Sequence, residues 1–287
     1  MWVLVTAMGC SGLNPKADIP SYVHVDRVSV VTTNSSQGSS SANITEAWLF
    51  VDDQFLGVYD IPFTAPILKG GPTSIRIEAG IRDNGINATP ELYPFYESVA
   101  LEPDLEPDRI DSFSLTFRYR EDTEFALVEN YEAGLTVFQE VITGTSANRL
   151  VARAEAAFEG QMGGLIELTT EAPAVELAST RRFRDLQAKG IPVYLEMNYR
   201  SEAPTQFGVL GFASGSEIPV DARYVAGFRP SDEWKKIYFN LSEAVANTDG
   251  DEYKLILQTS LPTRNDGTYT RNSAQVRIDN LKLLHFK

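Results

Sequence analysis

The shortness of its apolar segments is the feature that most constrains how this chain can fold. These segments alternate apolar with polar residues or are rich in Val, Ile, Tyr and Phe, and Gly, Pro, Asn and Asp separate them. A side-chain period of two with this enrichment is typical of strands that bury one face. In the second half, such segments lie at 163–169, 193–200, 206–212, 234–241 and 253–258, and a helical turn is expected at 242–245. We therefore predict an all-β protein of packed sheets.

The first half is predicted to form an immunoglobulin-like β-sandwich. Alternating segments lie at 22–31, 74–79, 95–101 and 112–119, and polar stretches at 32–41 and 80–94 are expected to be loops. The segment Glu46–Asp60 holds two apolar runs around Asp52, Asp53 and Gln54, which predicts a hairpin with an Asp-rich turn. About six or seven short strands in roughly a hundred residues are typical of such a sandwich.

Length and a charged stretch indicate two domains. The chain has 287 residues, more than the about 100–150 residues of a typical domain. The polar stretch 120–124 separates two regions of different pattern. We therefore expect a sandwich at 22–120 and a second β-domain at 125–287.

Charge and cysteine content exclude several partners. The net charge of −14 argues against nucleic acid, whose phosphates require a basic face, and against basic contacts to anionic lipid. The single cysteine rules out an intramolecular disulfide and a thiolate zinc site.

That cysteine closes an apolar run at the start of the sequence. Residues Ala7-Met8-Gly9-Cys10 resemble the lipobox of bacterial lipoproteins, in which small residues precede a cysteine that becomes acylated. The resemblance implies a signal peptide at 1–9, lipidation of Cys10 and a flexible tether at 10–21. It also implies an outer-membrane lipoprotein, lipid-anchored and facing either the periplasm or the outside, of the kind common in Bacteroidota. The alternative is an ordinary buried cysteine, and without Lys or Arg before the run the sequence leaves open whether Met1 is the true start.

Motifs at both ends of the second domain resemble those of jelly-roll carbohydrate-binding modules. Val128–Gly134 contains Asn-Tyr-Glu-Ala-Gly, similar to the opening Asn-Phe-Glu-x-Gly strand of that family, with Tyr131 in place of Phe. Val276–Phe286 contains Ile-Asp-Asn-Leu-Lys-Leu, similar to the closing Ile-Asp-Asn-Val-x-Leu strand. The resemblance implies a galactose-binding-like jelly roll at 125–287 that binds carbohydrate without catalysis.

A structural calcium ion is the one cofactor that this resemblance implies. In many jelly-roll modules such an ion ties the first strand to the last, and Glu132 and Asp279 stand at the matching ends. Carboxylates with backbone carbonyls suit this hard cation. The alternative is that Asp279 and Asn280 only make backbone hydrogen bonds where the last strand bends.

Sugar binding needs exposed aromatic rings beside polar side chains. We single out Tyr224, Arg229, Tyr269 and Arg271 as ligand contacts, since the last two lie in a polar turn. Further candidates are Tyr199 with Arg200, Phe228 and Asn272. Trp48 and Trp234 lie in predicted strands and are expected to be packing residues.

The sequence does not favour an enzyme. Its histidines are His24 and His285, no Gly-x-Ser-x-Gly motif is present, and the Glu-x-Asp-x-x-Glu spacing of jelly-roll glycosidases is absent. Alternation places His285 on the outer side of its strand.

Three hypotheses follow. The first is a non-catalytic lipid-anchored envelope protein whose jelly roll binds a polysaccharide or an envelope protein. The second is an assembly subunit of an outer-membrane transport or secretion complex. The third is a glycoside-active enzyme with an unrecognised carboxylate pair. The sequence names neither the ligand nor the oligomeric state.

Overall fold

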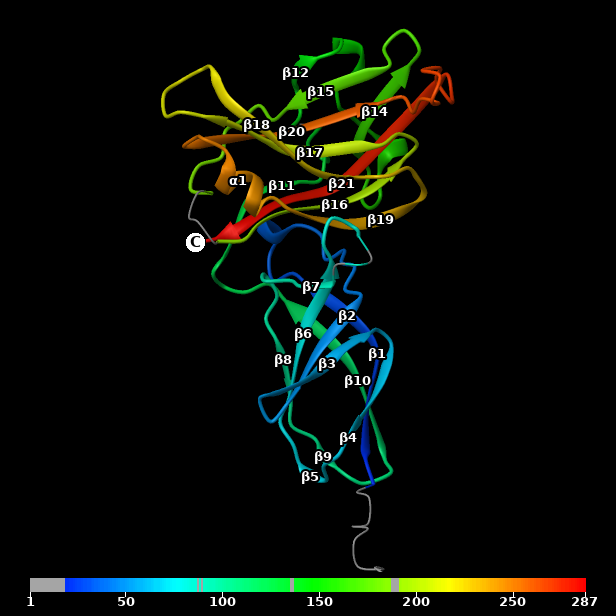
Figure 1. Cartoon of the computed structure of the whole chain (residues 1–287), viewed down its shortest axis with the longest axis vertical. Coiled ribbons are helices and arrows are strands. Elements are labelled where there is room, and N and C mark those ends of the chain that lie inside the picture. The colour runs from blue at the N-terminus through cyan, green and yellow to red at the C-terminus, as the bar shows by residue number, and fades with distance from the viewer. Residues whose placement is uncertain (1–18, 87, 89, 135–136, 187–190) are drawn as a thin grey trace, which may run out of the picture.

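The computed structural model describes residues 19–86, 88, 90–134, 137–186 and 191–287. It confirms the all-β prediction, and Figure 1 shows two β-sandwiches stacked end to end. The predicted lipidation residue Cys10 lies outside the described residues. Among the described residues, no helix has both the length and the apolar character needed to span a bilayer.

The N-terminal sandwich packs two sheets face to face. One has the order β10-β1-β4, and the other has the order β3-β2-β6-β7 with β8 also paired to β6. The strands are β1 (Ser21–Val31), β2 (Glu46–Val51), β3 (Gln54–Asp60), β4 (Phe63–Ile67), β6 (Ile75–Arg82), β7 (Pro90–Leu92), β8 (Val99–Leu101) and β10 (Ile110–Arg118), with a small pair of β5 (Gly71–Pro72) and β9 (Asp104–Leu105). Alternate residues such as Val23, Leu49 and Ile77 fill the space between the sheets, as the period of two predicts.

The hairpin predicted around Asp52 is present and tighter than expected. Asp52 and Asp53 both have positive φ, 49° and 62°, which a two-residue type I′ turn requires. Gln54 already belongs to β3 and pairs with Val51. Asp and Asn tolerate this backbone conformation better than most residues, which explains the pair of aspartates.

The C-terminal sandwich also has two sheets. One has the order β13-β14-β21-β16-β19 with β11 paired to β21, and the other, which we call the five-stranded sheet, has the order β12-β15-β20-β17-β18. The elements are β11 (Thr123–Glu129), β12 (Glu140–Thr143), β13 (Val151–Arg153), β14 (Gly163–Thr169), β15 (Ala174–Ala178), β16 (Val193–Ser201), β17 (Thr205–Phe212), β18 (Pro219–Phe228), β19 (Ser231–Asn240), α1 (Ser242–Asn247), β20 (Glu252–Ser260) and β21 (Ser273–Phe286). The first strand, β11, therefore lies beside the last strand, β21.

Two expectations about the first half need correction. The segment 95–101 is a strand only over β8, because Phe95 and Tyr96 turn into the core instead of alternating. The stretch 80–94 is not one long loop, because β6 continues to Arg82 and β7 follows at Pro90.

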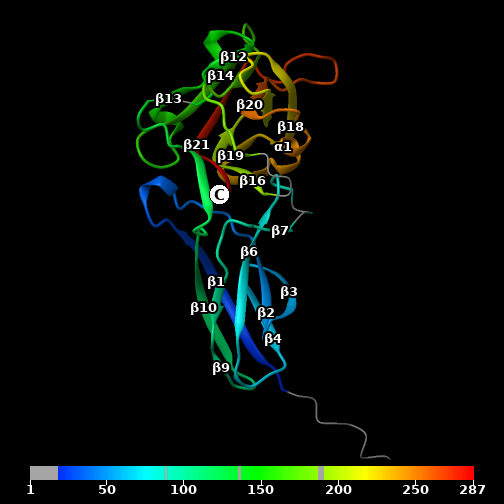
Figure 2. The same ribbon diagram turned by 90° about the vertical axis from the view of Figure 1, so that its left-hand side faces the viewer.

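The two sandwiches share a continuous aromatic core. Tyr93 packs against Tyr194 and Tyr238 of the C-terminal sandwich, with ring centroids 5.4 and 5.0 Å apart. Phe95 and Tyr194 are 5.9 Å apart. Figure 2 shows β16 and β19 above the end of the N-terminal sandwich, where these contacts lie.

Beneath these rings lies a buried ionic cluster, which we define as Glu196, Lys236 and Lys282. Lys236 Nζ lies 2.9 Å from Glu196 Oε2, and Lys282 Nζ donates to the Ser39 carbonyl at 2.6 Å. The Tyr119 hydroxyl donates to Glu196 at 3.0 Å, and Tyr93 donates to the same carboxylate. Charged groups without water need such partners, so the cluster fixes one sandwich against the other.

Burial and charge in this cluster also shift the pKa values of Lys282 and Glu196. Burial lowers the pKa of Lys282 to about 8, although Glu196 opposes this shift. Burial by itself would raise the pKa of Glu196, but Lys236, Lys282 and the Tyr93 hydroxyl hold it below its ordinary value. Glu196 therefore stays ionised at neutral pH.

Candidate functional site

A row of polar side chains crosses the outer face of the five-stranded sheet. Val175 and Leu177 of β15 point into the core, so the intervening Glu176 points outward. The register places Thr143 of β12 opposite Glu176, Glu176 opposite Gln258 of β20, and Gln258 opposite Gln206 of β17. Four neighbouring strands thus each contribute one polar side chain to a single line.

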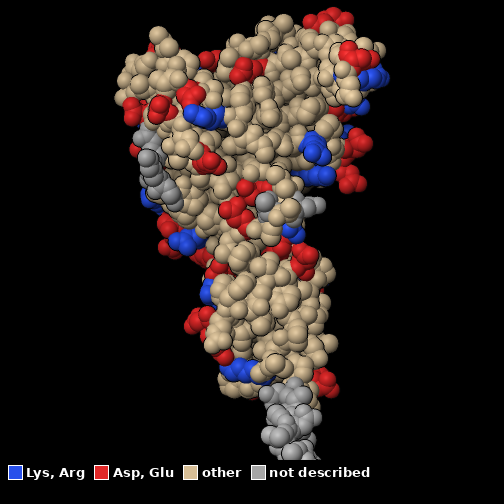
Figure 3. Space-filling view, viewed as in Figure 1, with Lys and Arg blue, Asp and Glu red and all other residues tan. Residues whose placement is uncertain are grey.

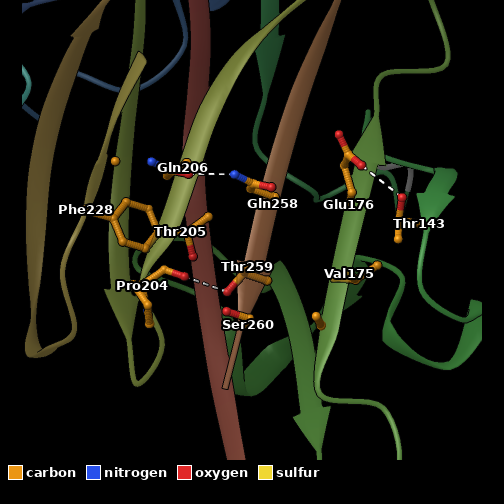
Figure 4. Close-up of a pocket in the computed structure, with 12 residues that line it drawn as sticks. Thr143, Val175, Glu176, Pro204, Thr205, Gln206, Phe228, Gln258, Thr259 and Ser260 are labelled. Atoms are coloured by element: carbon orange, nitrogen blue, oxygen red, sulfur yellow. Dashed lines mark hydrogen bonds between the residues drawn. The ribbon is translucent and has the colours of Figure 1, made fainter. Parts of the chain in front are cut away.

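Hydrogen bonds hold this polar row in place, as Figure 4 shows. The Thr143 hydroxyl donates to Glu176 Oε2 at 3.0 Å. The Gln258 side-chain amide donates to Gln206 Oε1 at 2.6 Å. Each pair keeps further hydrogen-bonding capacity, because a carboxylate and two amides offer more donor and acceptor sites than these two bonds occupy.

Tyr224 extends across the sheet to the polar row. Its hydroxyl donates to Glu176 Oε1 at 2.5 Å, although β17 and β20 separate its strand, β18, from β15. Tyr224 pairs with Gly208 of β17, and Gly208 pairs on its other side with Ile256 of β20, which is fully buried. A Cβ at Gly208 would lie 2.1 Å from the Arg223 carbonyl oxygen, so only glycine permits this close approach of β18. Burial, with the bond to Glu176, raises the pKa of Tyr224 and keeps the hydroxyl as a donor.

The polar row borders a groove of about 530 Å³. Its lining is mainly Thr, Ser and Gln, with the Phe228 ring at one side, and Glu176 is its one ionisable side chain. The Thr205 hydroxyl is buried and makes no hydrogen bond within the part of the chain that the structure describes. The groove therefore offers hydroxyl, amide and carboxylate partners rather than a set of catalytic groups.

The predicted ligand residues separate in the structure. Tyr224 lies by the polar row, and Arg229 is exposed directly after Phe228. Tyr269 and Arg271 lie in the loop between β20 and β21, where Arg271 donates to the Glu202 carbonyl at 3.2 Å. Tyr269 is 37% exposed, but neither residue lines the groove.

Two other aromatic candidates are packing residues. The Tyr199 and Phe228 rings stack with centroids 4.0 Å apart and planes at 7°, and both are buried. The Tyr199 ring therefore has no free face for a sugar. Sequence reasoning passed over Thr143, Glu176, Gln206 and Gln258 because it looked for aromatic rings. Their outward positions on alternating strands were the signal that could have found them.

Glu132 and Asp279 both hold one loop, which we call the 157–162 loop. Asp279 Oδ2 accepts the Phe158 and Glu159 backbone N–H groups at 2.8 and 3.3 Å. Glu132 Oε1 accepts those of Gln161 and Met162 at 2.7 and 2.9 Å. Glu132 follows the first strand of this sandwich and Asp279 lies in its last strand. Their carboxylates thus both accept hydrogen bonds from backbone N–H groups of the 157–162 loop.

This geometry does not fit the calcium site that the resemblance implies. A cation needs oxygen lone pairs around it, whereas N–H groups point at both carboxylates. Within the described residues, no group of three or more His, Cys, Asp or Glu is placed to hold a metal. The bonds at Asp279 instead match the alternative of backbone hydrogen bonding at the bend, where Asn280 has φ 50°.

The histidines lie apart from the groove. His24 Nδ1 is 2.9 Å from the Thr64 hydroxyl on the N-terminal sandwich. His285 is only 7% exposed, so its predicted outward position is wrong. Alternation does separate it from Leu284, but Leu284 packs in the core shared with the N-terminal sandwich, so His285 lies on the same side of β21 as Leu283, which faces the core of the C-terminal sandwich.

Comparison with known proteins gives distant structural likenesses. No protein-family model matches the sequence, and no curated protein matches it. A xylan-binding domain from Paenibacillus barcinonensis is 18% identical over 58% of this chain and 98% of that chain, with a TM-score of 0.38. A family 11 carbohydrate-binding module of a Clostridium thermocellum cellulase is 13% identical over 55% of this chain and 92% of that one, with a TM-score of 0.37. A carbohydrate-binding module of the β-sandwich superfamily is 15% identical over 83% of this chain and 84% of that one, at 0.36. Likenesses this distant carry no argument about function.

Proposed function

We propose that this protein binds a glycan chain, without catalysis, along the outer face of the five-stranded sheet. The observation that carries the proposal is the polar row of Thr143, Glu176, Gln258 and Gln206 across four strands. A sugar chain presents hydroxyl groups at regular intervals, and a line of fixed amides and a carboxylate can exchange hydrogen bonds with several of them at once. Because strands hold each side chain, binding needs little ordering of the protein.

The groove suits a neutral glycan. Its volume of about 530 Å³ lies within the about 300–1,000 Å³ of small-ligand sites. Glu176 would repel a carboxylated sugar and accept hydrogen bonds from hydroxyl groups. Tyr224 offers part of its ring as an apolar surface beside these polar groups.

Single substitutions in the polar row test this proposal. We expect Gln258→Ala and Tyr224→Ala to weaken binding of neutral polysaccharide by about tenfold each, since each removes a contact worth about 1.4 kcal/mol. Affinity electrophoresis of the full-length chain in gels containing xylan, β-glucan or mannan measures this change. Gln275→Ala is the matched control, because Gln275 lies on β21 of the other sheet. If none of these gels retards the wild-type protein or any variant, the proposal is wrong.

We further propose that the protein is an outer-membrane lipoprotein anchored through Cys10. The lipobox resemblance supports this, and β1 begins at the end of the molecule far from the C-terminal sandwich, as Figure 1 shows. A lipid anchor before β1 would then hold the glycan-binding sheet away from the membrane. We expect labelled palmitate to enter the wild-type protein and not Cys10→Ser. Equal labelling of both proteins would refute the anchor at this residue.

A protein partner is the second candidate. Edge strand β3 exposes Phe55, Leu56 and Val58, with exposed fractions of 53%, 44% and 39%. Figure 3 shows that the N-terminal sandwich carries few charged side chains on the face turned to the viewer. Exposed apolar edges are typical of contact surfaces. An absence of glycan binding would therefore favour the assembly role.

A further inference from the structure

We infer that Arg200 and Arg277, which we call the arginine pair, form a binding site for a tetrahedral oxyanion, namely a sulfate or phosphate group. The pair lies on the sheet of β13, β14, β21, β16, β19 and β11, which we call the six-stranded sheet. This site goes beyond the proposed glycan site, which lies on the other sheet of the same sandwich. Either proposal can therefore fail without the other.

Strand register places the two arginines side by side on the outer face of their sheet. Arg200 of β16 and Arg277 of β21 are direct partners in the antiparallel register. The neighbouring pair in this register, Tyr199 and Ile278, faces the core. Successive side chains of a strand point to opposite faces, so both arginines point outward. Directly opposed Cβ atoms lie about 4.5–5.5 Å apart, which brings the two side chains within reach of one anion.

No carboxylate pairs with either guanidinium group. Within the residues that the structure describes, no Asp or Glu lies at ion-pair distance from Arg200 or Arg277, and the Arg200 side chain makes no hydrogen bond. Arg277 Nη2 donates to a neutral acceptor, the side-chain oxygen of Gln275. Its Nε is buried and has no acceptor in the described part of the chain. Like charges directly opposite each other destabilise a sheet, and an anion between them would remove this cost.

The glutamates around the pair act on it only from a distance. Those whose charge reaches Arg277 are Glu202, Glu155 and Glu167. Glu202 accepts the backbone N–H of Gln275 at 2.8 Å, and Glu167 accepts its side-chain amide at 3.2 Å. Burial, followed by the charge of Arg200, lowers the pKa of Arg277 in spite of the three glutamates. The arginine pair therefore lacks sufficient negative charge nearby to balance it.

Two guanidinium groups together suit a tetrahedral oxyanion better than a carboxylate. Each guanidinium presents parallel N–H donors, and one such fork is enough to occupy both oxygens of a carboxylate. The oxygens of sulfate and phosphate point to the corners of a tetrahedron, so both arginines can bond to one ion. Both side chains are half-buried, which strengthens charge-assisted hydrogen bonds relative to bulk water. This combination is why we assign sulfate or phosphate.

Thermal unfolding of the full-length chain in sodium sulfate, phosphate, acetate or chloride of equal ionic strength tests the inference. We expect sulfate or phosphate to raise the melting midpoint of the wild type in a saturable way at millimolar concentration, whereas acetate and chloride do not. Arg200→Gln and Arg277→Gln should each bind the ion at least about tenfold more weakly. In chloride, Arg200→Gln should keep or exceed the wild-type midpoint, because it removes the repulsion and breaks no hydrogen bond. A residue that only stabilises the fold would instead lower this midpoint.

Arg118→Gln is the matched control. Arg118 is exposed on β10 of the N-terminal sandwich, and its substitution changes the net charge by the same amount. It should respond to each salt as the wild type does. A rise with only one of sulfate and phosphate supports the inference and identifies the ion. The inference is wrong if neither ion gives a saturable rise, if Arg200→Gln and Arg277→Gln respond as strongly as Arg118→Gln, or if acetate acts as strongly as both.

Discussion

Replacement of Glu196 by alanine is expected to lower the free energy of unfolding by about 3–5 kcal/mol. Glu196 is fully buried and accepts hydrogen bonds from Tyr93 and Tyr119 while it pairs with Lys236. Without its carboxylate, two buried ammonium groups would face each other with no opposite charge. Both sandwiches border this cluster, so the loss should destabilise their junction first.

Urea unfolding followed by fluorescence and circular dichroism measures this effect. We expect the Glu196→Ala midpoint to fall and the single transition of the wild type to separate into two as the sandwiches uncouple. Glu233→Ala is the matched control, because Glu233 is exposed on the neighbouring strand β19, and its effect should stay within about 0.5 kcal/mol. If Glu196→Ala and Glu233→Ala unfold at the same urea concentration, the cluster does not stabilise the junction.

Replacement of Asp279 by alanine is expected to cost about 2–3 kcal/mol and to free the 157–162 loop. Asp279 is fully buried, and its carboxylate accepts the backbone N–H groups of Phe158, Glu159 and Asn280. Removal would leave these donors without a partner.

Amide hydrogen exchange distinguishes this local effect from general destabilisation. The amides of Phe158 and Glu159 should exchange faster in Asp279→Ala, while those of the five-stranded sheet stay protected. Glu132→Ala serves as a graded control, because exposed Glu132 holds the other half of the loop and its loss should cost less. Unchanged exchange at Phe158 would mean that Asp279 does not hold the loop.

The pH dependence of stability provides a second check on Asp279. Burial raises its pKa to about 6 from the ordinary value of 3.8, although hydrogen bonds from the loop oppose the shift. A raised pKa means that folding favours the protonated carboxyl group. This contribution is fully present below pH 3.8 and is lost as the pH rises through 6. The wild type should therefore lose stability over this window relative to Asp279→Asn, whose side chain does not titrate.

The end-to-end stacking of the two sandwiches separates the start of the described chain from the five-stranded sheet. The start of β1 lies at the far end of the N-terminal sandwich, and the junction with the C-terminal sandwich is packed and ionic (Figures 1 and 2). Under the proposed function, the first sandwich would act as a rigid spacer between a lipid-anchored N-terminus and the sheet proposed to bind glycan. A flexible junction would instead allow the sheet to face any direction.

The sequence by itself determined the strands. Segments such as 193–200 and 206–212 alternate or are continuously apolar, and they became β16 and β17 with bounds shifted by at most one residue. The period of two is a local property, so a single chain reveals it without knowledge of neighbours. The Asp52–Asp53 turn was likewise readable from local residue types. Strands such as β18 were missed, because an edge strand that exposes many residues lacks a clear pattern.

Only the tertiary structure decided which side chains share a site. Thr143, Glu176, Gln206 and Gln258 are far apart in the sequence and ordinary in type, and strand order and register alone put them in one row. The groove of about 940 Å³ between the two sandwiches likewise needs Trp234 of one sandwich beside the segment 41–45 of the other. Strand pairing over long sequence separations depends on how whole sheets pack, and a slip of one residue would send each of these side chains to the opposite face. The local sequence pattern therefore determines which segments become strands, and the packing of the sheets determines which side chains these strands bring together.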